Sequence, residues 1–150
     1  MQNPTPFFWF DGKVGEAAKF YCSVFKKSKI VQLNGLANNI QSATLRLNGL
    51  ELILFNGGPH FKLTPAVSLM VPCKTQREVD YYWKKLTAGG EESRCGWLVD
   101  KFGLSWQIVP DMLFKVLSDQ DEAKSGRAMQ AMLQMRKLDI KALWRAHAGK

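Results

Sequence analysis

The sequence contains few of the residues that hold metals or form disulfides. Its 150 residues include three cysteines and two histidines, and the cysteines leave an odd count with no C-x-x-C pair. Cys22 and Cys73 lie in apolar or strand-end surroundings, where buried thiols are common. Because disulfides are rare in reducing compartments, the simplest expectation is a cytoplasmic protein with free thiols.

Signals for a membrane and for nucleic acid are also missing. No basic and then apolar leader is present, and no apolar run approaches the ~18–20 residues of a membrane span. The formal net charge of +8 raises nucleic acid or an anionic ligand as a partner. The charge is nevertheless scattered, with its densest groups at Lys26, Lys27 and Lys29 and at Arg136, Lys137 and Lys141. We therefore expect no membrane partner, no dedicated nucleic-acid binding, and a surface that mildly favours an anionic ligand.

What the sequence does contain is typical of a globular protein with a substantial core. Hydrophobic residues make up 46% of the chain and charged residues 23%, which argues against a disordered composition. A chain of this length favours one domain or two tightly fused half-domains.

The first half of the chain carries strand, helix and hairpin signals in turn. Phe7-Phe8-Trp9-Phe10 is a strand-prone aromatic run that Asp11-Gly12 ends. Apolar residues at helical spacing then predict an amphipathic helix over 14–25. Strands follow at 29–33, 41–47 and 50–55, and Asn48-Gly49 predicts a type I′ hairpin because both residues tolerate a positive φ.

The second half repeats this order and then becomes helical. A strand is expected over 66–71, ended by Pro72, then a helix over 76–86 and strands over 95–99 and 104–109. The tail predicts helices over 112–117, 128–135 and 140–147, the last one capped by Asp139. Met129, Met132 and Met135 recur at helical spacing and indicate a packing face.

An internal repeat connects the two halves. An offset of 61 places 7–25 on 68–86, and an offset of 54 places NGLELILFN on FGLSWQIVP, so that Ile53 meets Gln107. The predicted fold is α+β: two tandem βαβββ modules form a curved sheet around a cleft, followed by C-terminal helices. The expected organisation is a single domain with module one at about 4–56, a linker at 57–64, module two at about 65–110 and a helical tail at 111–150.

Alternation along the strands separates a helix-facing side from a cleft-facing side. The predicted helix side holds Leu50, Leu52, Leu54, Val67, Leu69, Val71, Leu104, Trp106 and Ile108. The other side mixes aromatic, aliphatic and polar residues: Thr5, Phe7, Trp9, Glu51, Ile53, Phe55, Ala66, Ser68, Met70, Ser105, Gln107 and Val109. This mixture favours a ligand cavity. Filling of the face by its own side chains or by a partner subunit remains the alternative.

Four segments carry a resemblance to a known family: TPFFWFDGKVGEAAKFYCSVF, NGGPHFKLTPAVSLMV, YYWKKLTAGGEESRCGWLVDKFGLSWQIVP and AMQAMLQMRKLDIKAL. They resemble the PhnB-like branch of the vicinal oxygen chelate superfamily, which also includes glyoxalase I, bleomycin-resistance proteins and extradiol dioxygenases. The resemblance spans essentially the whole chain and implies paired βαβββ modules and a homodimer. Members of this branch often carry a demethylubiquinone methyltransferase label. FDGKVGE lacks the glycine spacing of a nucleotide-binding loop, so we interpret that label as inherited rather than mechanistic.

The resemblance also implies where a metal would bind in metal-dependent relatives. The four ligand positions fall near Thr5 and at Ile53, Ala66 and Gln107. Of these, Gln107 keeps an oxygen donor, with at most a hydroxyl beside it. Zn²⁺, Ni²⁺ and Fe²⁺ prefer imidazoles and carboxylates. We therefore expect no bound catalytic metal and no cofactor.

These observations favour a small-molecule-binding protein that is metal-free and for which catalysis is left open. The ligand, anionic or aromatic in part, would contact Phe7, Trp9, Glu51, Phe55, His60, Ser68, Ser105 and Gln107. The alternatives are a metal-dependent lyase or dioxygenase-type enzyme, an enzyme that uses Glu51 or His60 as a base, or a methyltransferase as the family label suggests.

Overall fold

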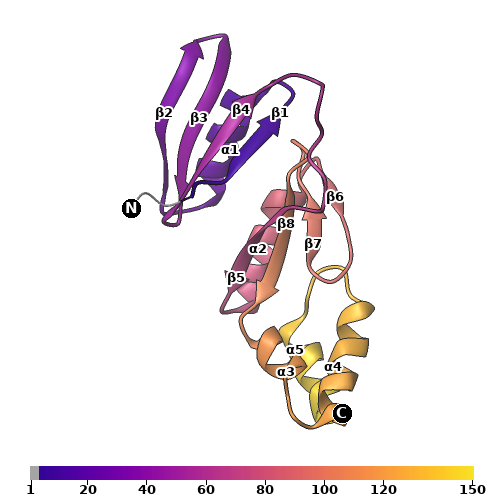
Figure 1. The fold of residues 1–150 in the computed structure, drawn as a ribbon. Coiled ribbons are helices and arrows are strands. Elements are labelled where there is room, and N and C mark those ends of the chain that lie inside the picture. Colours follow the sequence, from indigo (N-terminus) through magenta and orange to yellow (C-terminus); the bar gives the residue numbers. More distant parts are fainter. Residues whose placement is uncertain (1–3) are drawn as a thin grey trace. The chain divides into compact units, whose positions relative to one another are not determined.

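The computed structural model describes residues 4–150, and within that range each of two compact units holds a four-stranded sheet (Figure 1). The first unit ends at Thr64, and the second begins at Pro65. The first contains β1 (Phe7–Phe10), α1 (Val14–Val24), β2 (Ser28–Leu36), β3 (Asn39–Leu47) and β4 (Leu50–Asn56). Its strand order is β1-β4-β3-β2, with β1 parallel to β4 and the other pairs antiparallel.

The first unit folds around apolar residues that alternate along its strands. Alternate residues of β1, Phe8 and Phe10, are buried, as are Leu52 and Leu54 of β4. The buried stripe of α1 lies against the same side of the sheet and comprises Val14, Ala17, Ala18, Tyr21 and Val24. The predicted hairpin is confirmed, because Asn48 and Gly49 both have positive φ, 47° and 96°.

The second unit repeats this topology. It contains β5 (Ser68–Cys73), α2 (Gln76–Thr87), β6 (Glu91–Glu92), β7 (Trp97–Val99) and β8 (Ser105–Pro110), in the sheet order β5-β8-β7-β6. A capping box starts α2: the Thr75 hydroxyl accepts from the Glu78 amide, and the Glu78 carboxylate accepts from the Thr75 amide. The predicted α+β fold of two tandem βαβββ modules with C-terminal helices is therefore confirmed.

The two modules differ in register by two residues. Phe7 of β1 lies opposite Ile53 of β4. The sequence offsets place these two residues on Ser68 and Gln107, yet Ser68 lies opposite Ser105. Because side chains alternate with a period of two, this shift keeps each residue on its predicted face. The repeat thus predicts the faces and misplaces the positions along the strand.

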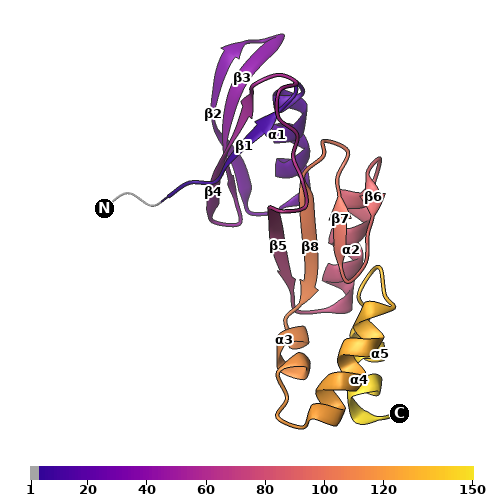
Figure 2. The same ribbon diagram turned by 45° about the vertical axis from the view of Figure 1, so that its right-hand side comes forward.

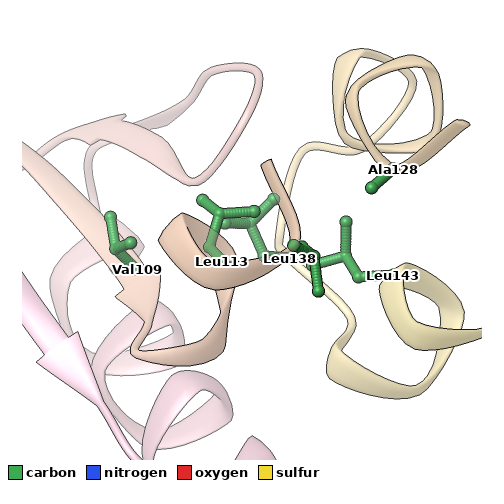
Figure 3. Packing of buried hydrophobic residues seen from close by; sticks show 6 residues of the cluster. Val109, Leu113, Ala128, Leu138 and Leu143 are labelled. Carbon is green, nitrogen blue, oxygen red and sulfur yellow. The ribbon is translucent and has the colours of Figure 1, made fainter. Parts of the chain in front are cut away.

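The chain after β8 forms three helices, α3 (Met112–Leu117), α4 (Glu122–Leu133) and α5 (Ile140–Ala148). They lie beyond the carboxyl ends of β5 and β8 (Figure 2). Asp139 caps α5 as predicted, because its carboxylate accepts from the Ala142 amide at 2.8 Å. The tail has its own core, which also includes one residue of β8 and which Figure 3 shows: Val109, Leu113, Val116, Ala128, Leu138 and Leu143.

A polar joint also holds the tail to the rest of the second unit. The Gln76 side chain donates to the Leu138 carbonyl at 3.1 Å and accepts from the Ile140 amide at 2.9 Å. The residues between α4 and α5 make a second contact, because the Gly96 amide donates to the Arg136 carbonyl at 2.7 Å. A Cβ at Gly96 would lie 2.7 Å from the Ile108 carbonyl oxygen and 3.0 Å from the Leu138 side chain, so the close approach requires glycine.

Several element bounds differ from the prediction. Pro72 lies inside β5 rather than after it, because β5 is an edge strand and can lack one amide donor. Cys95 has φ 56° and belongs to a turn, so β7 begins at Trp97. β6 is a two-residue strand of glutamates, too short and polar for a strand signal. Val67 and Leu50, both predicted to pack, are 62% and 44% exposed.

The described helices include none that is both long and apolar enough to cross a membrane. All three cysteines are free thiols. Burial raises the pKa of the Cys73 thiol to about 12, and the charges of Glu78 and Asp111 add to that effect. Because the thiolate is the reactive form, Cys73 is not suited to act as a nucleophile.

Candidate functional site

The open face of each sheet, which we define as the face opposite its helix, holds the predicted site residues other than His60. In the first unit this face carries aromatic rings at the β1–β4 edge. The Phe55 ring lies 5.5 Å from the Phe7 ring and 5.4 Å from the Trp9 ring, measured between centroids. Phe61 follows in the loop, with its centroid 5.1 Å from that of Trp9. Offset and edge-to-face rings at these separations attract one another, so the four residues form an aromatic cluster.

The loop after β4 holds Trp9 in place. The Trp9 indole Nε1–H donates to the Gly58 carbonyl at 2.8 Å. A Cβ at Gly57 would lie 2.1 Å from Cε2 of the same ring, so no larger residue fits there without displacing the indole. The predicted linker therefore covers part of the aromatic cluster, while Phe7 remains 58% exposed.

Toward β3 and β2 the same open face becomes polar. The Arg46 guanidinium donates to Glu51 Oε2 at 2.8 Å, and both side chains are about half exposed. Asn34 donates to the Ser42 hydroxyl at 3.0 Å and accepts from the Gln32 amide at 2.8 Å. Glu51 is thus held in an ion pair on the exposed, polar part of this face.

In the second unit, the open face places Gln107 beside Ser68, another predicted site residue. Its side-chain amide donates to the Ser68 hydroxyl at 2.8 Å. Trp97 lies opposite Gln107 on β7, and Met70 lies opposite it on β5. The donor group of this half-buried amide therefore has its hydrogen-bond partner within the sheet.

Beside this hydrogen bond lies a pocket of about 310 Å³. Its lining consists of Pro65, Ser93, Trp97, Leu98, Val99 and Ser105. Ser105 is 1% exposed, and its hydroxyl has no hydrogen-bond partner within residues 4–150. Leaving a buried hydroxyl unpaired costs about 1–3 kcal/mol, so this atom is the most unusual polar group on either face.

The sequence pattern identified Ser105 as a site residue, but the prediction did not include Trp97 and Val99, which also line the pocket. Trp97 and Val99 alternate with the buried Leu98, and this alternation was the available signal for an open-face position. The prediction of a strand over 95–99 did not assign faces to these residues. They lie opposite Gln107 and Ser105 respectively, which places them on the same face.

The predicted site residues separate into two groups. The first unit contains Phe7, Trp9, Glu51, Phe55 and His60, and the second contains Ser68, Ser105 and Gln107. His60 lies in an exposed turn after Pro59, apart from the sheet face. The structure thus brings Ser68, Ser105 and Gln107 together, and it brings Phe7, Trp9 and Phe55 together.

The residues at the four implied metal positions do not fit a divalent transition metal. Thr5 and Ala66 are exposed and precede their strands, and Ile53 offers no donor atom. Gln107 is left with an amide, which such metals bind weakly compared with imidazole or carboxylate. Throughout residues 4–150, no group of three or more histidine, cysteine, aspartate or glutamate side chains could hold a metal ion.

A larger cavity of about 390 Å³ lies at the start of α1, on the helix side of the first sheet. Its lining includes Lys13, Glu16 and Lys19, whose side chains are exposed, together with the turn between β2 and β3. The described part of this lining contains no buried polar atom without a partner. We therefore assign the candidate site to the smaller pocket, whose lining includes the unpaired Ser105 hydroxyl.

The paired βαβββ units define the class of this protein as the glyoxalase-type fold of the vicinal oxygen chelate superfamily. The chain belongs to the family described as 3-demethylubiquinone-9 3-methyltransferase, whose model matches residues 2–109. The tail after residue 110 lies outside that match. Among curated proteins, none matches this chain.

Solved structures support the same assignment. The PhnB protein from Bacillus cereus is 35% identical, with a TM-score of 0.67, and the match covers 73% of this chain and 99% of that one. Protein PA1353 from Pseudomonas aeruginosa has the same fold at 16% identity, with a TM-score of 0.61 and coverage of 73% and 98%. The fosfomycin resistance protein FosX from Listeria monocytogenes, complexed with manganese(II) and sulfate, is 14% identical, with a TM-score of 0.53 and coverage of 70% and 88%.

Proposed function

We propose that the chain binds a small, partly apolar molecule on the open faces of its sheets, without a metal or another cofactor. The observation that carries this proposal is the buried, unpaired Ser105 hydroxyl among the residues that line a pocket. Gln107 and Ser68 supply further polar atoms beside it, and Phe7, Trp9 and Phe55 supply a second, aromatic surface. Glu51, on the polar part of the first face, and His60, in the exposed turn after Pro59, complete the set of proposed contacts.

The proposal extends to the state of the protein in the cell. We propose a cytoplasmic homodimer in which both modules and the tail act as one glyoxalase-like domain. Free thiols suit a reducing compartment. The homodimer follows from the family resemblance, and gel filtration with light scattering measures it directly.

A thermal-shift screen tests the binding function. EDTA-treated protein is heated with uncharged and anionic ring compounds, and a ligand at 100 times its Kd stabilises the protein by about 2.7 kcal/mol. Phe7→Ala or Gln107→Ala is expected to reduce the shift. Phe114→Ala is the matched control, because Phe114 is 59% exposed in the tail and Phe7 58% exposed on the open face. The proposal fails if no compound shifts the protein, or if every shift survives both open-face substitutions.

A metal-dependent lyase or dioxygenase-type enzyme is the second candidate. The observation in its favour is the shared fold with FosX in its manganese(II) complex. Metal analysis of the purified protein and assays with added Mn²⁺, Zn²⁺, Ni²⁺ and Fe²⁺ test this candidate. Stoichiometric metal that Gln107→Ala removes would support it and overturn the metal-free proposal.

Methyl transfer is the activity that the family description names. The segment FDGKVGE runs from the last residue of β1 through residues 11–13 into the first turn of α1, and its two glycines, Gly12 and Gly15, are not spaced as a nucleotide-binding loop requires. Calorimetric titration with S-adenosylmethionine tests this activity, and saturable binding would restore the methyltransferase interpretation.

A further inference from the structure

We infer that the pocket beside Ser105 takes an uncharged compound of one or two rings that carries a hydroxyl or carbonyl group. This inference rests on the proposed binding function and names the ligand class of the same site. It differs from the expectation drawn from net charge, which favoured an anion. The residues that line the pocket determine which ligand class it accepts, because they replace the solvent around a bound ligand. The net charge of the whole surface has less influence on this choice.

The walls of the pocket are apolar and carry no charge among the described residues. Pro65, Trp97, Leu98 and Val99 form most of the lining, and two serines provide its side-chain hydroxyls. An ionised ligand would lose its hydration here without gaining a counter-charge, which is strongly unfavourable. Glu91 lies opposite Val99 on the neighbouring strand, and its carboxylate would repel an anion bound beside Val99.

Ser105 specifies what the ligand must offer. Its hydroxyl is 1% exposed and unpaired within residues 4–150, while the neighbouring Ser68 hydroxyl already accepts from Gln107. A serine hydroxyl provides one donor and two acceptor positions, so a hydroxyl or a carbonyl oxygen can complete it. A ligand with neither group would leave the buried oxygen unpaired and gain contact with the walls alone.

The volume limits the size of the compound. An engineered apolar cavity of about 150 Å³ accepts one benzene molecule. The pocket, at about 310 Å³, offers roughly twice that space. One or two fused rings therefore fit, and the Trp97 indole supplies an aromatic wall against which they can pack.

Three naphthalene compounds of similar shape test the ligand class. 2-Naphthol is uncharged at pH 7, because a phenolic hydroxyl has a pKa of about 10. 2-Naphthoate carries a negative charge, and naphthalene carries no oxygen. Calorimetric titration is expected to give 2-naphthol a Kd about two- to tenfold lower than that of naphthalene, since one hydrogen bond contributes about 0.5–1.5 kcal/mol. The difference from 2-naphthoate is expected to be larger, because an unpaired charge costs more.

Ser105→Ala shows whether the hydroxyl anchors the ligand. It is expected to weaken 2-naphthol binding about tenfold and to leave naphthalene unchanged, whereas Ser42→Ala, on the open face of the first sheet, leaves both unchanged. A melting temperature of Ser105→Ala at or above that of the unsubstituted protein shows that the loss is not due to unfolding.

Each remaining outcome decides between the two proposals. Equal or tighter binding of 2-naphthoate overturns the uncharged class but supports small-molecule binding. Unchanged affinity of Ser105→Ala for 2-naphthol overturns Ser105 as the anchor. If no naphthalene compound binds while the thermal-shift screen finds other ligands, the ligand class is wrong and the binding function stands; if neither experiment finds a ligand, both fail.

Discussion

The first module covers its open face with aromatic rings that pack on one another, whereas the second leaves a pocket beside a buried hydroxyl. Both modules have the same strand order and the same parallel central pair. In the first, the Trp9 indole donates a hydrogen bond to the Gly58 carbonyl in the loop after β4, and Glu51 forms an ion pair with Arg46. In the second, Ser105 has no such partner among the described residues. The same topology therefore supports one face whose polar groups have hydrogen-bond partners and one face with an unpaired hydroxyl. The face with the unpaired hydroxyl is the better candidate for binding.

Strand length explains part of this difference. In the first module β2 and β3 each run for nine residues, so polar side chains of β2, β3 and β4 reach one another on that part of the face. In the second, β6 has two residues and β7 has three. Because these strands are short, Ser105 and Val99 lie at the ends of β8 and β7. Pro65 and Ser93 line a pocket beside them, where a longer strand would place further residues. The tail then buries Val109, the last open-face residue of β8.

The largest predicted effect distinguishes the cores of the two units. Leu138→Ala removes a fully buried side chain from the tail core and is expected to destabilise the second unit by about 2–5 kcal/mol. Hydrogen exchange measures this as faster exchange in residues 65–150. Leu36→Ala, at a site 80% exposed in the first unit, serves as control and should change stability by less than about 0.5 kcal/mol. Equal destabilisation by both would contradict the assignment of a separate tail core.

The next effect concerns the aromatic cluster. Gly57→Ala places a Cβ against the Trp9 indole and is expected to cost about 2 kcal/mol, because overpacking displaces the ring. Chemical denaturation measures the loss, and the Trp9 fluorescence should change with it. Gly126→Ala is the matched control: it lies in α4 with open space around its Cβ position and should stabilise by about 0.5–1 kcal/mol. An unchanged stability of Gly57→Ala would show that the loop does not hold the ring.

A smaller effect of opposite sign is expected on the second open face. Ser105→Ala removes an unpaired buried hydroxyl and should stabilise the ligand-free protein by about 1 kcal/mol. Ser42→Ala in the first module loses the hydrogen bond from Asn34 and should be neutral or slightly destabilised. Thermal unfolding of the two variants side by side measures the contrast. Destabilisation by Ser105→Ala would mean that the hydroxyl is satisfied and that the two faces are alike.

The last predicted effect is a loss of stability at alkaline pH, and it comes from the thiols of Cys73 and Cys22. Burial raises the pKa of Cys73 to about 12, and it also raises the pKa of Cys22, where a hydrogen bond with Ser28 partly opposes it. A raised thiol pKa means that the folded state favours the neutral form. The resulting stability is fully present below the unfolded pKa of 9.0 and is lost as the pH rises toward 12.

Unfolding experiments between pH 7 and 11 check this expectation. The stability of the unsubstituted protein should fall above pH 9, and Cys73→Ala should remove more of that dependence than Cys22→Ala. The same alkaline slope in Cys73→Ala and in the unsubstituted protein would assign the dependence to other groups.

Local patterns predicted most of the framework correctly. The Asn48-Gly49 turn, the start of α1 at Val14 and the α3 bounds, Met112–Leu117, all follow from signals within a few residues. The alternation along β4 and β8 predicted which side chains face the helices, with the exposed Leu50 as an exception. These features depend on the backbone preferences of neighbouring residues, so a single sequence is enough to reveal them.

Predictions about the site were less complete for a physical reason. The pairing of Gln107 with Ser68 joins residues 39 positions apart, and the two-residue difference in register depends on how β5 and β8 align. Pro72 belongs to a strand because β5 lies at the edge of the sheet, a property that no local signal carries. Trp97 and Val99 form a pocket because Pro65 and Ser93 lie beside them in space.

The amino-acid sequence alone was enough to establish the paired modules, the two faces of β1, β4, β5 and β8 and the poor set of metal donors. Those properties follow from residue identity and from the alternation of side chains, which do not depend on long-range packing. The selection of Ser105 as the unsatisfied group came from the folded structure. Burial and hydrogen-bond partners depend on every element that packs around an atom, so the polar residue with an unmet requirement becomes visible once the chain is folded.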